Sequence, residues 1–98
     1  MSIQQETVLE MVIHDLGYES VSNYALQKAR EELQTQLQDY RRLAIVFEKK
    51  YQMNFQTFDK TFHELTSWSL FEREDDCMEW RSYQTVIDHL ENQLKILV

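Results

Sequence analysis

After Gly17 the chain contains no glycine and no proline, and the residues from Ser20 to about Tyr51 are predicted to form one uninterrupted helix. Gly17 is the only glycine in all 98 residues. Turns and irregular segments depend on glycine and proline, so their scarcity favours long helices over a fold of sheets and tight turns. A helix of about 30 residues is about 45 Å long. That length exceeds the width of a compact domain of this size, so the helix must project or pair with another long helix.

Apolar residues recur at steps of three and four along this predicted helix, which is the spacing of one helical face. Ser20 or Ser22 is suited to cap its N-terminus. Ala25 and Ala29 are small enough to let a partner helix approach closely. The full stripe comprises Val21, Ala25, Ala29, Leu33, Leu37, Tyr40, Ala44, Phe47 and Tyr51.

Two further helices are predicted in the second half of the chain. Asn54 is suited to cap a short helix from Phe55 to Leu65 that presents an aromatic face. Ser69 with Glu72 three residues later has the spacing of a capping box, which starts a second long helix. Apolar residues of this helix again follow steps of three and four to the C-terminus, through Trp80, Tyr83, Ile87, Leu90, Leu94 and Leu97.

The N-terminal segment from Glu6 to Leu16 carries one helical stripe, formed by Val8, Leu9, Val12, Ile13 and Leu16. A short strand is the alternative, and helix is favoured. Gly17 stands where a helix end requires a left-handed residue.

These elements predict an all-α fold in a single domain, residues 1–98. We expect a long antiparallel helical hairpin, with a short helix at its turn and an N-terminal helix. A hairpin alone leaves one face of each helix exposed to water. A homodimeric, coiled-coil-like helical bundle would bury more apolar area, so we expect a dimer. The predicted core and dimer seam comprises Leu33, Leu37, Tyr40, Ala44, Phe47, Trp80, Tyr83, Ile87, Leu90 and Leu94.

The net charge of −7 limits the classes of partner. An acidic domain repels phosphate backbones, so nucleic-acid binding is not expected, although Arg41, Arg42, Lys49 and Lys50 remain candidates for it. The charge favours a basic protein partner. The lone Cys77 fits a reducing compartment. The sequence has no apolar run of membrane-spanning length, and we expect a cytoplasmic protein.

Carboxylates are densest at the start of the second long helix, where two interpretations coexist. Anions favour a helix N-terminus and cations a C-terminus, and the hairpin would bring this cluster near Lys50. Capping and mutual neutralisation could therefore explain the whole cluster. Alternatively it forms an acidic surface for a basic partner, with aromatic anchors beside it. The candidate partner-binding residues are Trp68, Phe71, Glu74, Asp75, Asp76 and Glu79.

No catalytic, cofactor or metal site can be assembled from the residue spacing. His14, His63 and His89 lack the Glu-x-x-His spacing of helical di-iron proteins. Asp59 with His63, and Glu10 with His14, each supply only two ligands on one helix. The carboxylates around Cys77 oppose formation of a thiolate nucleophile. We therefore predict neither an enzyme nor a metalloprotein.

Two motifs resemble those of a known group of proteins. The first is the run from Phe47 to Phe58, FEKKYQMNFQTF, and the second is the run from Glu74 to Trp80, EDDCMEW. They resemble small prokaryotic antitoxins of the TumA-like group, which are paired with TumE-type toxins. The matching positions are Tyr51, Met53, Phe55, Phe58, Asp75, Asp76, Glu79 and Trp80.

The resemblance implies a helical protein of a toxin–antitoxin system that neutralises its cognate toxin by protein–protein interaction. The alternative is a coiled-coil structural adaptor, a homodimer without a toxin.

Overall fold

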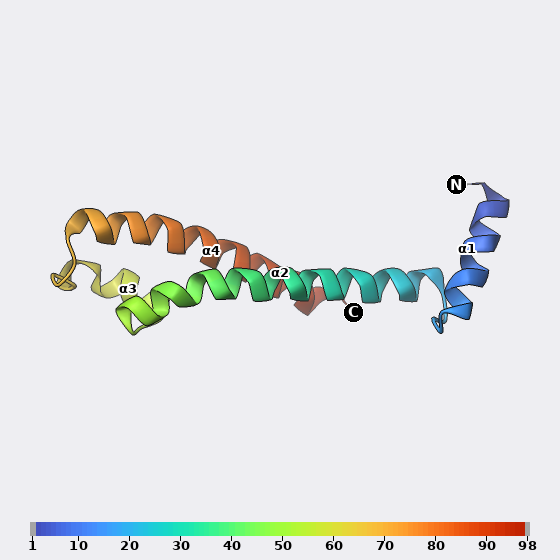
Figure 1. Cartoon of the computed structure of the whole chain (residues 1–98), viewed down its shortest axis with the longest axis horizontal. Coiled ribbons are helices and arrows are strands. Elements are labelled where there is room, and N and C mark those ends of the chain that lie inside the picture. The colour runs from blue at the N-terminus through green and yellow to red at the C-terminus, as the bar shows by residue number, and fades with distance from the viewer. Residues whose placement is uncertain (1, 98) are drawn as a thin grey trace.

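The computed structural model describes residues 2–97, and within them every regular element is a helix (Figure 1). This confirms the predicted all-α fold. The elements are α1 (Ile3–Asp15), α2 (Val21–Tyr51), α3 (Phe55–Thr61), the short 3-10 helix η1 (Phe62–Glu64) and α4 (Leu70–Ile96).

Four helices begin at a side-chain cap. Ser20, Asn54 and Ser69 each accept a hydrogen bond from the backbone N–H three residues ahead, which confirms the three predicted starts. Such a cap contributes about 1 kcal/mol to helix stability. Ser2 and Gln5 form a reciprocal capping box at the start of α1 that the sequence analysis did not anticipate.

The ends of α1 and α2 follow the predicted breaks, whereas the short helix predicted to reach Leu65 ends at Thr61 and continues as η1. The segment proposed as helix or strand is helical, and Gly17 directly after its end has φ of +98°. α2 ends at Tyr51 because Gln52 adopts the left-handed conformation with φ of 55°, and its N–H donates to the carbonyl of Glu48. A left-handed residue at this place is a common way to terminate a helix.

The two long helices pack against each other as an antiparallel hairpin, as predicted (Figure 1). The molecule measures 65 × 20 × 19 Å, with a radius of gyration of 20.7 Å. A compact chain of this length has a radius of gyration of about 13 Å. We call the end with α3, η1 and the start of α4 the closed end. The opposite end, with α1 and the first turns of α2, is the open end, where α1 turns away from the axis of α2 (Figure 1).

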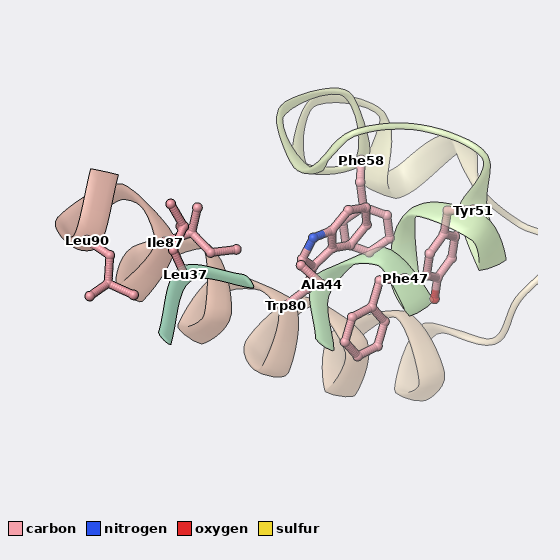
Figure 2. Packing of buried hydrophobic residues seen from close by; sticks show 8 residues of the cluster. All are labelled: Leu37, Ala44, Phe47, Tyr51, Phe58, Trp80, Ile87 and Leu90. Carbon is pink, nitrogen blue, oxygen red and sulfur yellow. The ribbon is translucent and has the colours of Figure 1, made fainter. Parts of the chain in front are cut away.

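The core follows the hairpin seam and is widest at the closed end. All ten predicted seam residues lie in this core or pack against it, and their packing is within one chain. The buried members of the cluster are Leu37, Ala44, Phe47, Tyr51, Phe58, Trp80, Ile87 and Leu90 (Figure 2).

Trp80 is the centre of the closed end and is fully buried. Its indole stacks on Phe47, at 5.7 Å between ring centroids, and packs against Phe58 at 5.1 Å (Figure 2). Phe55 meets it edge to face at 5.3 Å. The indole N–H finds no hydrogen-bond acceptor among residues 2–97. Within residues 2–97 the ring therefore contributes through packing and makes no hydrogen bond.

Replacing Phe58, which is fully buried, tests this core. We expect Phe58→Ala to lower the free energy of unfolding by about 3–5 kcal/mol, because it opens a cavity beneath Trp80. Chemical denaturation followed by circular dichroism measures the loss. The matched control is Phe71→Ala, at a phenylalanine that is 80% exposed, and it should change stability by no more than about 0.5 kcal/mol. Equal losses in the two variants would contradict the packing.

Candidate partner-binding face

The six candidate binding residues lie at the closed end, but they differ in exposure. Glu74, Asp75 and Glu79 are exposed on α4, and Phe71 is 80% exposed. The other two, Trp68 and Asp76, are directed into the fold.

Trp68 is half-buried and packs on Tyr51, with ring centroids 4.7 Å apart. It closes the edge of the aromatic core and offers only part of its surface to a partner. Trp68 therefore acts mainly in packing the core rather than in binding a partner.

Asp76 was predicted to face a partner, and its placement in the structure is different. Only 9% of the residue is exposed. Its Oδ2 atom accepts hydrogen bonds from the Lys50 ammonium and the Tyr51 hydroxyl, both at 2.6 Å. Asp76 stands one turn before Trp80, so it continues the buried seam of α4. Its charge is neutralised within the chain and is not available to steer a partner.

Arg73 is a second charged residue of the seam, and it was not singled out from the sequence. It is buried, and its guanidinium donates to the carbonyls of Phe62 and Trp68. The same guanidinium lies 5.2 Å from the Phe62 ring centroid. Because Arg73 is two turns before Trp80, the heptad spacing of the seam was a signal for its position. It fastens the start of α4 to η1.

The hydrogen bonds to Asp76 affect the protonation of its two partners. The hydrogen bond from Lys50 to Asp76 is the main cause that raises the lysine pKa, and burial opposes it. Burial is the main cause that raises the pKa of Tyr51, and the hydrogen bond to Asp76 adds to it. Both donors are protonated at neutral pH, and their raised pKa values extend the protonated range further into alkaline pH. The contribution of these two hydrogen bonds to stability is therefore complete below the usual pKa values of lysine and tyrosine and is lost only as the pH rises through the raised ones.

The opposite side of α4 carries two large apolar side chains. Nine residues, or two and a half helical turns, separate Phe71 from Trp80, so these side chains point in opposite directions. Met78 follows Phe71 by two turns and is 76% exposed. Glu74 and Asp75 stand between them on the same side. We call Phe71, Glu74, Asp75 and Met78 the acidic face of α4. The sequence analysis did not single out Met78.

A groove borders this face toward α3. It has a volume of about 730 Å³, is open to solvent and is mostly apolar. Arg81 lies in it and binds Asp59 on α3 at 2.9 Å, with Cys77 Sγ 3.7 Å away. Cys77 is half-buried. The groove lining comprises Phe62, Glu74, Cys77, Met78, Arg81, Ser82 and Thr85.

Several other predicted charges pair within the chain. Lys50 also lies 3.6 Å from the carboxylate of Glu72, so of the predicted neutralisation between the two helix ends the structure shows the contacts of Lys50 with Glu72 and Asp76. Arg41 binds Glu91 across the hairpin at 3.1 Å. Arg42 binds Asp39 within α2 at 2.9 Å. Glu79 accepts a hydrogen bond from the Tyr83 hydroxyl at 2.7 Å, so it is partly engaged too.

Residues 2–97 hold no group of three or more histidine, cysteine or acidic side chains arranged to bind a metal ion. None of the helices in that range is both long enough and apolar enough to cross a membrane. In comparisons with known proteins, no family model, curated protein or solved structure matches this chain.

The Asp76 interaction can be tested by neutralising the carboxylate. Asp76→Asn should lower the free energy of unfolding by about 1.5–3 kcal/mol, because two hydrogen bonds lose their charged acceptor. Urea denaturation at neutral pH measures the change. Asp75→Asn removes the same charge from an exposed neighbour, and its effect should stay within about 0.5 kcal/mol. If both variants lose the same stability, the carboxylates stabilise the start of α4 by their charge alone, and the contacts of Asp76 with Lys50 and Tyr51 add nothing.

Proposed function

We propose that this chain is an antitoxin-like binding protein that neutralises a cognate basic toxin through the acidic face of α4. The observation that carries the proposal is the pair of exposed side chains, Phe71 and Met78, on the side of α4 opposite its core seam. Glu74 and Asp75 stand between them. Apolar anchors flanking two carboxylates suit a partner that has an apolar hollow and basic residues.

The two kinds of residue would act at different stages of binding. Carboxylates attract a basic partner over a distance and raise the rate of association. Large apolar side chains, once buried, hold the complex together and slow its dissociation. The net charge of −7 adds to the attraction. The same surface would therefore favour both fast and durable capture of a basic protein.

The resemblance to TumA-like antitoxins supports the proposal, and the fold divides its positions into two groups. Tyr51, Phe58, Asp76 and Trp80 are buried at the closed end, where they hold α2, α3 and α4 together. Asp75 and Glu79 are exposed on α4, while Met53 and Phe55 are half-buried at the edge of the core. The motif thus combines residues of the scaffold with a residue of the proposed binding face.

The alternative function is a coiled-coil structural adaptor that works as a homodimer. A specific observation favours it, namely the 65 Å length of the molecule and the exposed apolar residues of α1. A dimer without a toxin partner would use those features and leave the acidic face unoccupied.

Coexpression with the product of the adjacent gene tests the antitoxin proposal. The wild-type chain should rescue growth and copurify with that product. The double variant Glu74→Lys, Asp75→Lys should slow association at least tenfold at low salt, because it replaces two attractive charges by two repulsive ones. Phe71→Ala with Met78→Ala should weaken the complex roughly 30-fold, the equivalent of about 2 kcal/mol for the loss of a central anchor.

The control has the same change of charge elsewhere. Glu19→Lys with Glu32→Lys alters two exposed carboxylates at or near the open end, and it should leave rescue and binding unchanged. A wild-type chain that neither rescues growth nor copurifies would refute the antitoxin function. Equal effects of the two charge reversals would show that net charge matters and the acidic face does not.

A further inference from the structure

The open end exposes an apolar stripe that the hairpin core does not use. Val8, Val12 and Leu16 follow one another at single turns along α1 and are 59%, 49% and 63% exposed. Ile13, on a neighbouring side of the same helix, is buried. α1 is therefore docked by one side, while its apolar stripe faces solvent.

The first turns of α2 also lack a helix packed against them from α4, because α4 ends before it reaches them. The guanidinium of Arg30 donates to the carbonyl of Leu97 at 3.2 Å, which marks where α4 ends against α2. From Ala29 back to Val21 the helix continues beyond that point (Figure 1). Ala25 is exposed there, and its small side chain permits close approach of another helix. Ile96, at the end of α4, is 68% exposed beside this stretch.

The exposed apolar area at the open end matches what a stable dimer requires. Each large aliphatic side chain contributes on the order of 100 Å² when it is buried. Val8, Met11, Val12, Leu16 and Ile96 together offer roughly 500 Å². A standard interface buries about 800 Å² per partner, of which a little over half is apolar.

At the open end α1 is acidic, and the α2–α4 end carries charges of both signs. Glu6, Glu10 and Asp15 make α1 acidic. Lys28 and Lys95 are basic residues of the early part of α2 and the end of α4. Lys28 pairs with Glu31 of its own chain at 3.4 Å, so Lys95 is the basic side chain that the carboxylates of an α1 helix from another molecule would meet there. The same arrangement would cover both apolar surfaces.

We propose that a second copy of this chain docks at the open end, in a two-fold homodimer. In it, α1 of each copy covers the stretch of α2 from Val21 to Ala29 and the Ile96 side chain of the other. This contact would be the interface of the homodimer proposed above. It differs from the predicted dimer seam, whose residues pack against each other within one chain. It also leaves the acidic face of α4 free, so dimerisation and toxin capture are independent.

The experiment is sedimentation velocity of the full-length chain over a range of concentrations. The wild type should have the mass of two chains of 11.9 kDa each. Val12→Glu should weaken the dimer at least 30-fold, because it places a charge at the centre of the contact. The matched control is Val46→Glu, at a valine of α2 that is 61% exposed, and it should remain a dimer. Val8→Glu tests the same surface independently if the first variant aggregates.

A monomeric wild type would overturn the proposal. A dimer that Val12→Glu and Val8→Glu leave intact would also overturn it, since the contact would then lie elsewhere. Capture of the adjacent gene's product is measured in parallel on each variant. If Val12→Glu and Val8→Glu are monomers that still capture the gene product, both proposals are supported. If the wild type is a dimer that does not capture it, only the toxin function is refuted.

Discussion

The burial of Trp80 is the interaction on which the rest of the structure depends. It fixes the rotation of α4 about its own axis, because the indole must lie between Phe47, Phe55 and Phe58. Once that rotation is fixed, Asp76 reaches Lys50 and Tyr51 on one side, and Phe71 is held away from the core on the other. The exposed face of α4 is thus a consequence of the packing around one side chain.

Sequence reasoning found the elements and their boundaries because those depend on local chemistry. The caps Asn54 and Ser69, the break after Tyr51 and the glycine after α1 act within a few residues of the chain. The hairpin followed from the lengths of two helices and the short element between them. These features could be predicted without knowledge of distant contacts.

The orientation of charged residues at the start of α4 was predicted less well, for a physical reason. A carboxylate such as Asp76 is normally placed in solvent, and it can be buried only when partners arrive from another helix. Lys50 and Tyr51 supply those partners from α2, and the backbone carbonyls of Phe62 and Trp68 do so for Arg73. Met78 was missed for the converse reason, because an apolar residue is not expected on the outside of a helix.

The two ends of the molecule can therefore carry separate tasks. The closed end holds the aromatic core and presents the acidic face, while the open end presents the solvent-exposed apolar stripe of α1. Oxidation of the methionines by mild peroxide, followed by mass spectrometry, tests this account most directly. When the adjacent gene's product is bound, Met78 should become protected from oxidation, whereas Met11 on α1 should react as it does in the free chain. Unchanged oxidation of Met78 in the complex would contradict the assignment of the acidic face as the binding surface.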